Sequence, residues 1–396
     1  MLKSFSKNEK QIIVLLFLSW FVLVFMWQQD YDYSEFIQYW IHYLDESLFG
    51  CYTHLDDVEH FLNYPPLYIL YLWLLRKPLL WSMGHHLLPV TLFLLKIGVW
   101  LFHFGFSKYL YDRVHKKFAW FWLLNPVFIY IDFTTIHIDE ILCGVMFLCI
   151  YSMVQKRHVC VFFWFTIGCL LKLQGCYLLP VLLVYVWQNR KLYQKFLKYT
   201  FYSVGMALFV YLPFMIQSKM LLLPVRLYLK GFQSNYDAME LPIQIHGFFV
   251  WTARLWNELL YDFLMERFYV YLGIPILLCI IVYFVWLQKR VSIWLALCTY
   301  FYTIFYVSCS QNYRYFSYAI MFAGVLMCFF EDLYYKKLLN VLVVMFFANV
   351  FVNIMGQVVN IYRQWIFLLI VLYGSLYLYS LWSFYRFQKF VLNKAS

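Results

Sequence analysis

The chain has 396 residues, of which 64% are hydrophobic and 13% charged, whereas soluble domains are about half apolar and one quarter charged. This composition excludes a soluble globular protein, and continuous rather than alternating apolar runs exclude a β-barrel. The net charge of +11 is spread thinly between those runs, so it does not form the basic patch of a nucleic-acid-binding protein.

Twelve apolar runs are candidate membrane helices. They lie near residues 11–27, 88–108, 118–134, 139–155, 159–171, 176–187, 199–217, 268–288, 291–308, 315–330, 338–356 and 364–384. The first run follows a basic stretch but has no small-residue cleavage site after it, so we expect it to be retained. The sequence therefore predicts an all-α integral membrane protein. We expect a polytopic bundle of about 11–12 transmembrane helices that forms one membrane domain, residues 1–396.

The charges between these runs indicate the orientation of the chain. If the N-terminus is cytoplasmic, the loops on that side hold 20 of the 31 Lys and Arg residues and only four acids. The outer side and the membrane interior hold the remaining 11 basic and 16 acidic residues. This distribution follows the positive-inside rule. It predicts a cytoplasmic N-terminus and places the segments 28–87 and 218–267 on the extracytoplasmic side as long loops.

The loop 28–87 begins with two acids. Asp30 and Asp32 follow the first span directly, where a carboxylate at the end of a rigid helix has a fixed position near the membrane surface. The alternative is that these two acids are ordinary solvent-exposed residues at a helix end, without a catalytic role. Further along, Pro65 and Pro66 predict a rigid turn at the start of a short apolar segment, which we expect to be interfacial.

Two later hairpins carry polar residues. The hairpin 118–155 turns around Asp132, His137, Asp139 and Glu140, which could hold a divalent cation but match no closed metal motif. Basic loops flank the run 159–187, and two helices of about 13 residues reach only about 20 Å each. We therefore expect this second hairpin to turn below the outer surface at residues 172–175.

The turn of the second hairpin contains a lysine. Lys172 at that depth is costly unless it faces a polar cavity or an anion, which makes it a candidate functional residue. Snorkelling of the side chain to the headgroups is the alternative. Near the start of a later span, Arg314 and the helix N-terminus could bind an anion together, or Arg314 could be an interfacial anchor.

Several motifs follow one another along the chain. They are Asp32-Tyr33, Phe36, Trp40, Tyr64-Pro65-Pro66-Leu67-Tyr68, Asn125-Pro126, Asp139, Lys172-Leu173-Gln174, Pro180 and Arg314-Tyr315-Phe316, in that order. In this order they resemble the motifs of one superfamily of enzymes, the GT-C glycosyltransferases. The chain is most similar to bacterial relatives of the second mannosyltransferase of GPI-anchor assembly, over about residues 10–330. The resemblance implies a GT-C-like fold with a large first outer loop.

The resemblance also implies a reaction. Such enzymes transfer a sugar, mannose or another hexose, from a polyprenyl-phosphate donor to an acceptor hydroxyl of a glycolipid or cell-surface polysaccharide. Asp32 would be the general base, and Lys172 and Arg314 would hold the donor phosphate. We expect inversion, an extracytoplasmic active site in a bacterial plasma membrane, and no certain cofactor beyond a possible divalent cation.

The candidate residues fall into two groups. They are Asp32 and Asp139 for catalysis, and Asp30, Trp40, Tyr64, Pro65, Pro66, His137, Lys172, Gln174, Arg314 and Tyr315 for substrate binding. A polysaccharide polymerase or ligase would share the phosphate-binding cations. A lipid-linked oligosaccharide flippase would instead need ionisable groups near the midplane and an internal repeat, and no clear repeat is present.

Overall fold

The computed structural model describes only part of the chain. The described residues are 6–26, 33–56, 62–134, 136–237, 292–307, 313–330 and 332–358, with a few single residues beyond 370. Every regular element in these ranges is a helix, which confirms the all-α prediction. The expected span at 268–288, nearly all of that at 364–384 and most of the loop 218–267 lie outside the described residues.

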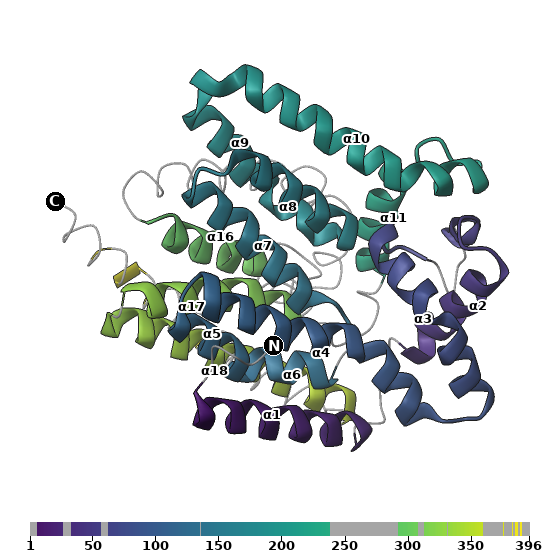
Figure 1. Ribbon diagram of the computed structural model, residues 1–396, viewed down its shortest axis with the longest axis horizontal. Helices are drawn as coiled ribbons and strands as arrows, with labels where there is room; N and C mark the ends of the chain where they lie inside the picture. The colour runs from purple at the N-terminus through teal and green to yellow at the C-terminus, as the bar shows by residue number, and fades with distance from the viewer. Residues whose placement is uncertain are drawn as a thin grey trace, which may run out of the picture. The chain divides into compact units, whose positions relative to one another are not determined.

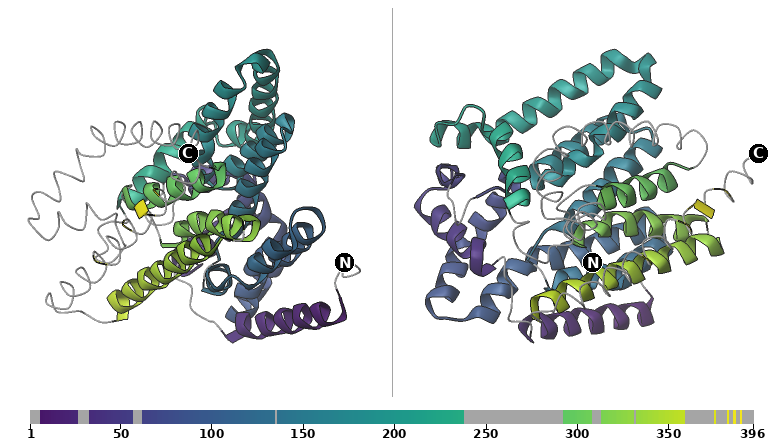
Figure 2. Two further views of the ribbon diagram at one scale, coloured as in Figure 1. Left: turned by 90° about the vertical axis from the view of Figure 1, so that its left-hand side faces the viewer. Right: turned by 180° about the vertical axis from the view of Figure 1, so that it is seen from behind.

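The chain divides into two compact units, Met1–Gln233 and Ser234–Ser396. The helices from the N-terminus to the unit boundary are α1 (Lys7–Met26), η1 (Tyr33–Ile37), α2 (Gln38–Glu46), η2 (Cys51–His54), α3 (Pro66–Gly84), α4 (Leu88–Arg113), α5 (Lys116–Leu124), α6 (Pro126–Thr134), α7 (Asp139–Val154), α8 (His158–Leu171), η3 (Leu173–Leu178), α9 (Leu179–Gln188), η4 (Arg190–Leu192), α10 (Tyr193–Gln217) and α11 (Leu223–Asp237). Within the first unit, α8 lies between α7 and α10, and α4 packs against α1, α5 and α7 (Figures 1 and 2).

A capping box starts α1. The backbone N–H of Ser6 donates to Oε2 of Glu9 at 2.8 Å, and the N–H of Glu9 donates to Oγ of Ser6 at 3.3 Å. The same glutamate accepts hydrogen bonds from the Tyr111 hydroxyl, at 3.1 and 3.2 Å, and from Nε1 of Trp120, at 3.3 Å. These bonds fasten the start of α1 to the end of α4 and to α5.

The segment expected to be the first outer loop folds into η1, α2, η2 and α3. Pro65 is the extended N-cap of α3, with ψ 161°, and Pro66 is its first helical residue, where a missing N–H costs nothing. Arg76 and Lys77 do not end this helix, because both are favourable helix residues, and they lie 3.5 and 2.6 Å from Oδ1 of Asp45 of α2. Apolar side chains of these elements form one core with residues from α4, α10 and α11.

The run expected as a single span at 118–134 is two helices of nine residues, α5 and α6. Asn125 separates them with extended backbone, ψ 115°, because the proline at 126 disfavours helical geometry in the residue before it. The side-chain oxygen of Asn125 then accepts the N–H of Val127 at 3.0 Å, as an N-cap does.

The second hairpin turns at the expected residues. After the 14 residues of α8, Lys172 takes an extended conformation, and η3 continues from Leu173. Fourteen helical residues rise about 21 Å, less than the thickness of a bilayer core. Gly175 of η3 lies so close to α8 that a Cβ atom there would be 2.3 Å from the carbonyl carbon of Gly168.

We expect Gly175→Ala to be more damaging than an ordinary glycine-to-alanine change. The added methyl group would collide with backbone rather than with a movable side chain, so η3 must shift away from α8. Overpacking of this kind costs about 1–3 kcal/mol. Thermal unfolding in detergent measures it, with Gly84→Ala as the control because nothing lies within 4 Å of a Cβ at that glycine. Equal unfolding temperatures for the two variants would contradict this close packing.

Two helices among the described residues are long and apolar enough to cross a membrane, Leu88–Arg113 and Arg190–Gln217. Four shorter apolar helices are also present. They are His158–Leu171, Leu173–Gln188, Ile293–Tyr302 and Arg314–Phe330. The predicted number of about 11–12 spans and their orientation therefore stay predictions.

The C-terminal unit contains four described helices. They are α16 (Ile293–Val307), η7 (Tyr313–Phe316), α17 (Ser317–Phe330) and α18 (Leu333–Val358). α17 packs against both α16 and α18, and almost all of its side chains are buried. Arg314 belongs to η7, the short helix that leads into α17.

Candidate functional site

The polar residues of the hairpin between α6 and α7 separate into two clusters instead of forming one site. His137 and Asp139 join Tyr64 and Lys172, and we call these four residues the lysine cluster. Asp132 and Glu140 instead face His103 of α4, and we call these three residues the histidine triad. The hairpin thus supplies residues to two sites in the N-terminal unit.

A buried ion pair forms the centre of the lysine cluster. Nζ of Lys172 donates to Oδ1 of Asp139 at 2.7 Å, and the side chains are only 4% and 0% exposed. The extended backbone of Lys172 between α8 and η3 places the residue here, while Asp139 occupies the first turn of α7. A carboxylate is stabilised there by the helix dipole, and the ammonium of Lys172 neutralises it further.

A group of aromatic side chains lies on one side of this ion pair. Nζ of Lys172 lies 5.7 Å from the centre of the Tyr64 ring, within the range of a cation–π interaction. The Tyr64 hydroxyl and Nδ1 of His137 share a hydrogen bond of 2.8 Å. Trp40 and Tyr68 pack against the Tyr64 ring, with centroids 5.5 and 4.6 Å away. These contacts join α2 and the start of α3 to the hairpins that carry Asp139 and Lys172.

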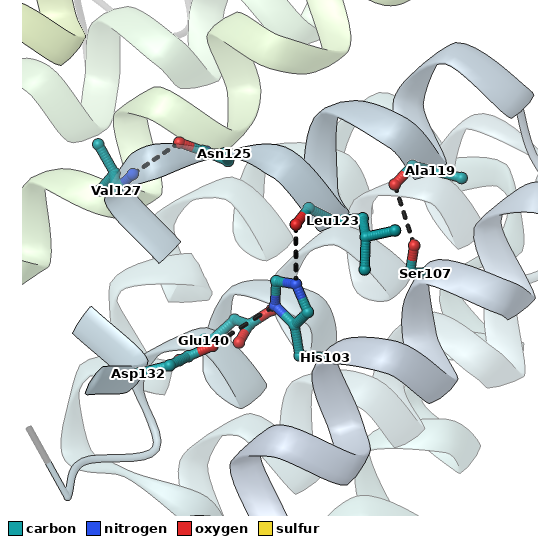
Figure 3. Close-up of polar contacts among 8 residues, drawn as sticks. All are labelled: His103, Ser107, Ala119, Leu123, Asn125, Val127, Asp132 and Glu140. Atoms are coloured by element: carbon teal, nitrogen blue, oxygen red, sulfur yellow. Dashed lines mark hydrogen bonds and ion pairs between the residues drawn. The ribbon is translucent and has the colours of Figure 1, made fainter. Parts of the chain in front are cut away.

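The histidine triad is buried where α4, α6 and α7 meet (Figure 3). Nδ1 of His103 lies 2.6 Å from Oε1 of Glu140 and 3.4 Å from Oδ2 of Asp132. One ligand atom from each residue lies within 4.8 Å of the other two, a spacing at which they could hold a metal ion. His103, Asp132 and Glu140 are 0%, 5% and 1% exposed.

The break between α5 and α6 determines how His103 is held. In a continuous helix the Leu123 carbonyl would accept the N–H of Val127, but here that N–H donates to Asn125. The Leu123 carbonyl instead accepts Nε2–H of His103 at 3.2 Å (Figure 3). One turn further along α4, Oγ of Ser107 donates to the Ala119 carbonyl at 3.0 Å. These two bonds fix the orientation of α4 against α5.

The structure brings together many of the candidate residues from the sequence. Trp40, Tyr64, His137, Asp139 and Lys172 form one continuous set of contacts. Pro65 and Pro66 start the helix beside Tyr64, and buried Gln174 lies two residues beyond Lys172. The metal interpretation of the hairpin needs one correction: His103, rather than His137 or Asp139, accompanies Asp132 and Glu140. The hairpin reverses direction between α6 and α7, so that its side chains point to different neighbours.

Other candidates cannot be assigned to the lysine cluster. Asp30 and Asp32 lie outside the described residues. Arg314 and Tyr315 belong to the C-terminal unit, where the guanidinium carbon of Arg314 lies 5.8 Å from the centre of the Tyr315 ring. Arg314 is 8% exposed, and the Ser317 hydroxyl donates to its carbonyl at 2.6 Å. Their predicted roles stay predictions.

Among the residues that the structure describes, two buried ionisable residues were missed in the sequence, and both lie inside the apolar run 88–108. His103 completes the histidine triad, and Lys96 donates from Nζ to the Phe133 carbonyl at 2.5 Å. An ionisable residue in the middle of an apolar run is itself a signal of function, and this signal could have identified both residues.

The chain was also compared with known proteins. Neither the comparison with models of protein families nor that with curated proteins finds a match.

Proposed function

We propose that the chain is a membrane glycosyltransferase. It transfers a sugar, mannose or another hexose, from a polyprenyl-phosphate donor to an extracytoplasmic hydroxyl of a glycolipid or cell-surface polysaccharide. The lysine cluster forms part of its substrate site. The motif order that resembles GT-C enzymes and the apolar composition support this proposal, as do the two helices long enough to span a bilayer.

One observation carries the proposal: Tyr64, His137, Asp139 and Lys172 are in contact although they come from three separate parts of the chain. The cluster offers a cation, hydrogen-bonding groups and aromatic surface together. A buried lysine has a function or a strong structural partner, because its charge is expensive in an apolar interior. Here the carboxylate of Asp139 keeps the ammonium charged and in place until a donor phosphate approaches.

The proposed reaction is a single displacement. The acceptor oxygen forms a bond to the anomeric carbon while the bond from that carbon to the phosphate oxygen breaks. The carboxylate of Asp32 takes the proton of the acceptor hydroxyl. The bonding electrons leave with the polyprenyl phosphate, whose negative charge is stabilised by Lys172. Because the nucleophile attacks from the side opposite the phosphate, the anomeric configuration inverts.

The test is transfer by the purified protein in detergent or nanodiscs, with synthetic polyprenyl-phosphate mannose and other hexoses as donors. We expect one of these donors to release polyprenyl phosphate and to give a product of inverted configuration. Retention of configuration, or a trapped covalent glycosyl-enzyme, would contradict the mechanism. Activity only with oligosaccharide-diphosphate donors would favour a polymerase or ligase. Movement of such lipids across the membrane of vesicles, without transfer of sugar, would favour a flippase.

A further inference from the structure

We propose that the histidine triad binds a zinc ion. The proposal does not depend on glycosyl transfer, because the triad lies apart from the contacts of the lysine cluster and comes from a different set of side chains. Its ligands are Nδ1 of His103, a carboxylate oxygen of Glu140 and the carboxylate of Asp132. They come from α4, α7 and α6 and converge in the interior of the N-terminal unit (Figure 3).

The first reason is the orientation of the imidazole ring. Nε2 carries a proton, because it donates to the Leu123 carbonyl at 3.2 Å. In a neutral ring the lone pair of Nδ1 is then directed toward Glu140 and Asp132. A metal-bound histidine usually donates its other ring N–H to a carbonyl or carboxylate, which fixes the tautomer and the ring. The cap at Asn125 frees the Leu123 carbonyl for this task.

The second reason is the set of oxygens that lack hydrogen bonds. Neither carboxylate oxygen of Asp132 nor Oε2 of Glu140 accepts a hydrogen bond of ordinary geometry among the described residues, and the two carboxyl groups lie close enough to share a proton. Both acids are more than nine-tenths buried, and such oxygens are costly without a partner. A proton shared by the two acids could satisfy two of the three oxygens. A cation that binds both oxygens of Asp132 and one of Glu140 satisfies more of them and also uses the nitrogen of His103.

The third reason is charge. When both carboxylates are ionised they carry a charge of −2, and Lys96 supplies one positive charge beside them through its bond to the carbonyl of Phe133, the residue after Asp132. One ammonium cannot neutralise both acids when they are ionised, so a further positive charge is then needed between Asp132 and Glu140. A divalent ion supplies it at the point where the three ligand atoms converge.

The ligand types select the metal. Mg²⁺ and Ca²⁺ prefer sets made only of oxygen ligands, whereas an imidazole nitrogen with carboxylates suits Zn²⁺. Zn–N and Zn–O bonds of about 2.0–2.2 Å in tetrahedral geometry place ligand atoms about 3.3 Å apart. The distance of 3.4 Å from Nδ1 to Asp132 matches this value, whereas the 2.6 Å from Nδ1 to Oε1 of Glu140 is a hydrogen-bond distance that would lengthen by about 0.7 Å on metal binding. In this position zinc would connect α4, α6 and α7.

Metal analysis of the full-length protein in detergent tests the proposal. We expect elemental analysis to find about one zinc per chain in the wild type, and at least tenfold less in His103→Gln and Glu140→Gln. Ser107→Ala is the matched control, since Ser107 is also a buried polar residue of α4 but faces the Ala119 carbonyl; it should retain the zinc. Equal zinc in wild type and both triad variants would overturn the proposal.

A second measurement uses only the wild type, in case the triad variants do not fold. Chelator-treated protein is titrated with Co²⁺, and the visible d–d absorption is followed. We expect a band that saturates at about one equivalent and disappears when Zn²⁺ is added. If no band forms and purified protein holds no zinc, the triad is a cluster of acids that share a proton. Loss of zinc with full sugar transfer would leave the proposed function intact.

Discussion

Replacement of Lys172 by methionine is expected to lower the free energy of unfolding by about 3–5 kcal/mol. Methionine keeps the length of the side chain but removes its charge, so Asp139 stays buried without the ammonium 2.7 Å from its Oδ1. Removal of one partner of a buried ion pair has this cost because the remaining charge has no water to solvate it. Chemical or thermal unfolding in detergent measures the change.

Two further variants separate the ion pair from side-chain packing. Lys172→Met combined with Asp139→Leu removes both charges and should recover part of the lost stability. Lys77→Met is the matched control: Lys77 also donates to a carboxylate and lowers the pKa of Asp45, but the two side chains are 68% and 34% exposed. In Lys77→Met, water solvates the exposed carboxylate of Asp45, so no measurable loss in the free energy of unfolding is expected. Equal loss in both lysine variants would show that burial does not determine the cost.

Asp32→Asn is expected to reduce the rate of sugar transfer by about 10²–10⁴-fold. The amide keeps the size of the side chain but cannot accept the proton of the acceptor hydroxyl, and a general base typically contributes this factor. The change should fall on kcat rather than on KM, because the base acts on the transition state more than on bound substrate. Initial rates with the best polyprenyl-phosphate donor measure it.

Asp30→Asn is the control for the base, since it removes one negative charge only two residues away. We expect a much smaller effect on kcat from this variant. Full activity in Asp32→Asn would exclude Asp32 as the base and move the assignment to Asp30 or Asp139. Equal losses in both variants would indicate that the local negative charge matters, rather than one proton acceptor.

The sequence predicts much of the lysine cluster because two of its members, and the turn beside a third, have local signals. Lys172 interrupts an apolar run, Pro65 and Pro66 determine where a helix can start, and Asp139 follows the turn of a hairpin. The contact between these signals depends on how α3, α7 and α8 pack, which no local pattern contains. The motif order predicts these residues as one group but does not predict which of them are in contact.

The histidine triad could not be assembled from the sequence for a related reason. Asp132 and Glu140 lie eight residues apart around a turn, where His137 is the nearest histidine along the chain. The residue that joins them comes from α4, about 30 positions earlier, and its orientation depends on the carbonyl freed at Leu123. Asn125-Pro126 shows where a helix breaks, but not which side chain uses the freed carbonyl.

Adjacent residues at the start of α7 serve different clusters. Asp139 binds Lys172, and Glu140 binds His103. Successive side chains of an α-helix differ in direction by about 100°, so a rotation of α7 that lengthens one contact also displaces the other. The two clusters are therefore expected to be thermodynamically linked. A ligand that draws Lys172 away from Asp139 would change the affinity of the triad for its cation, and the cation would change the affinity for that ligand by the same factor.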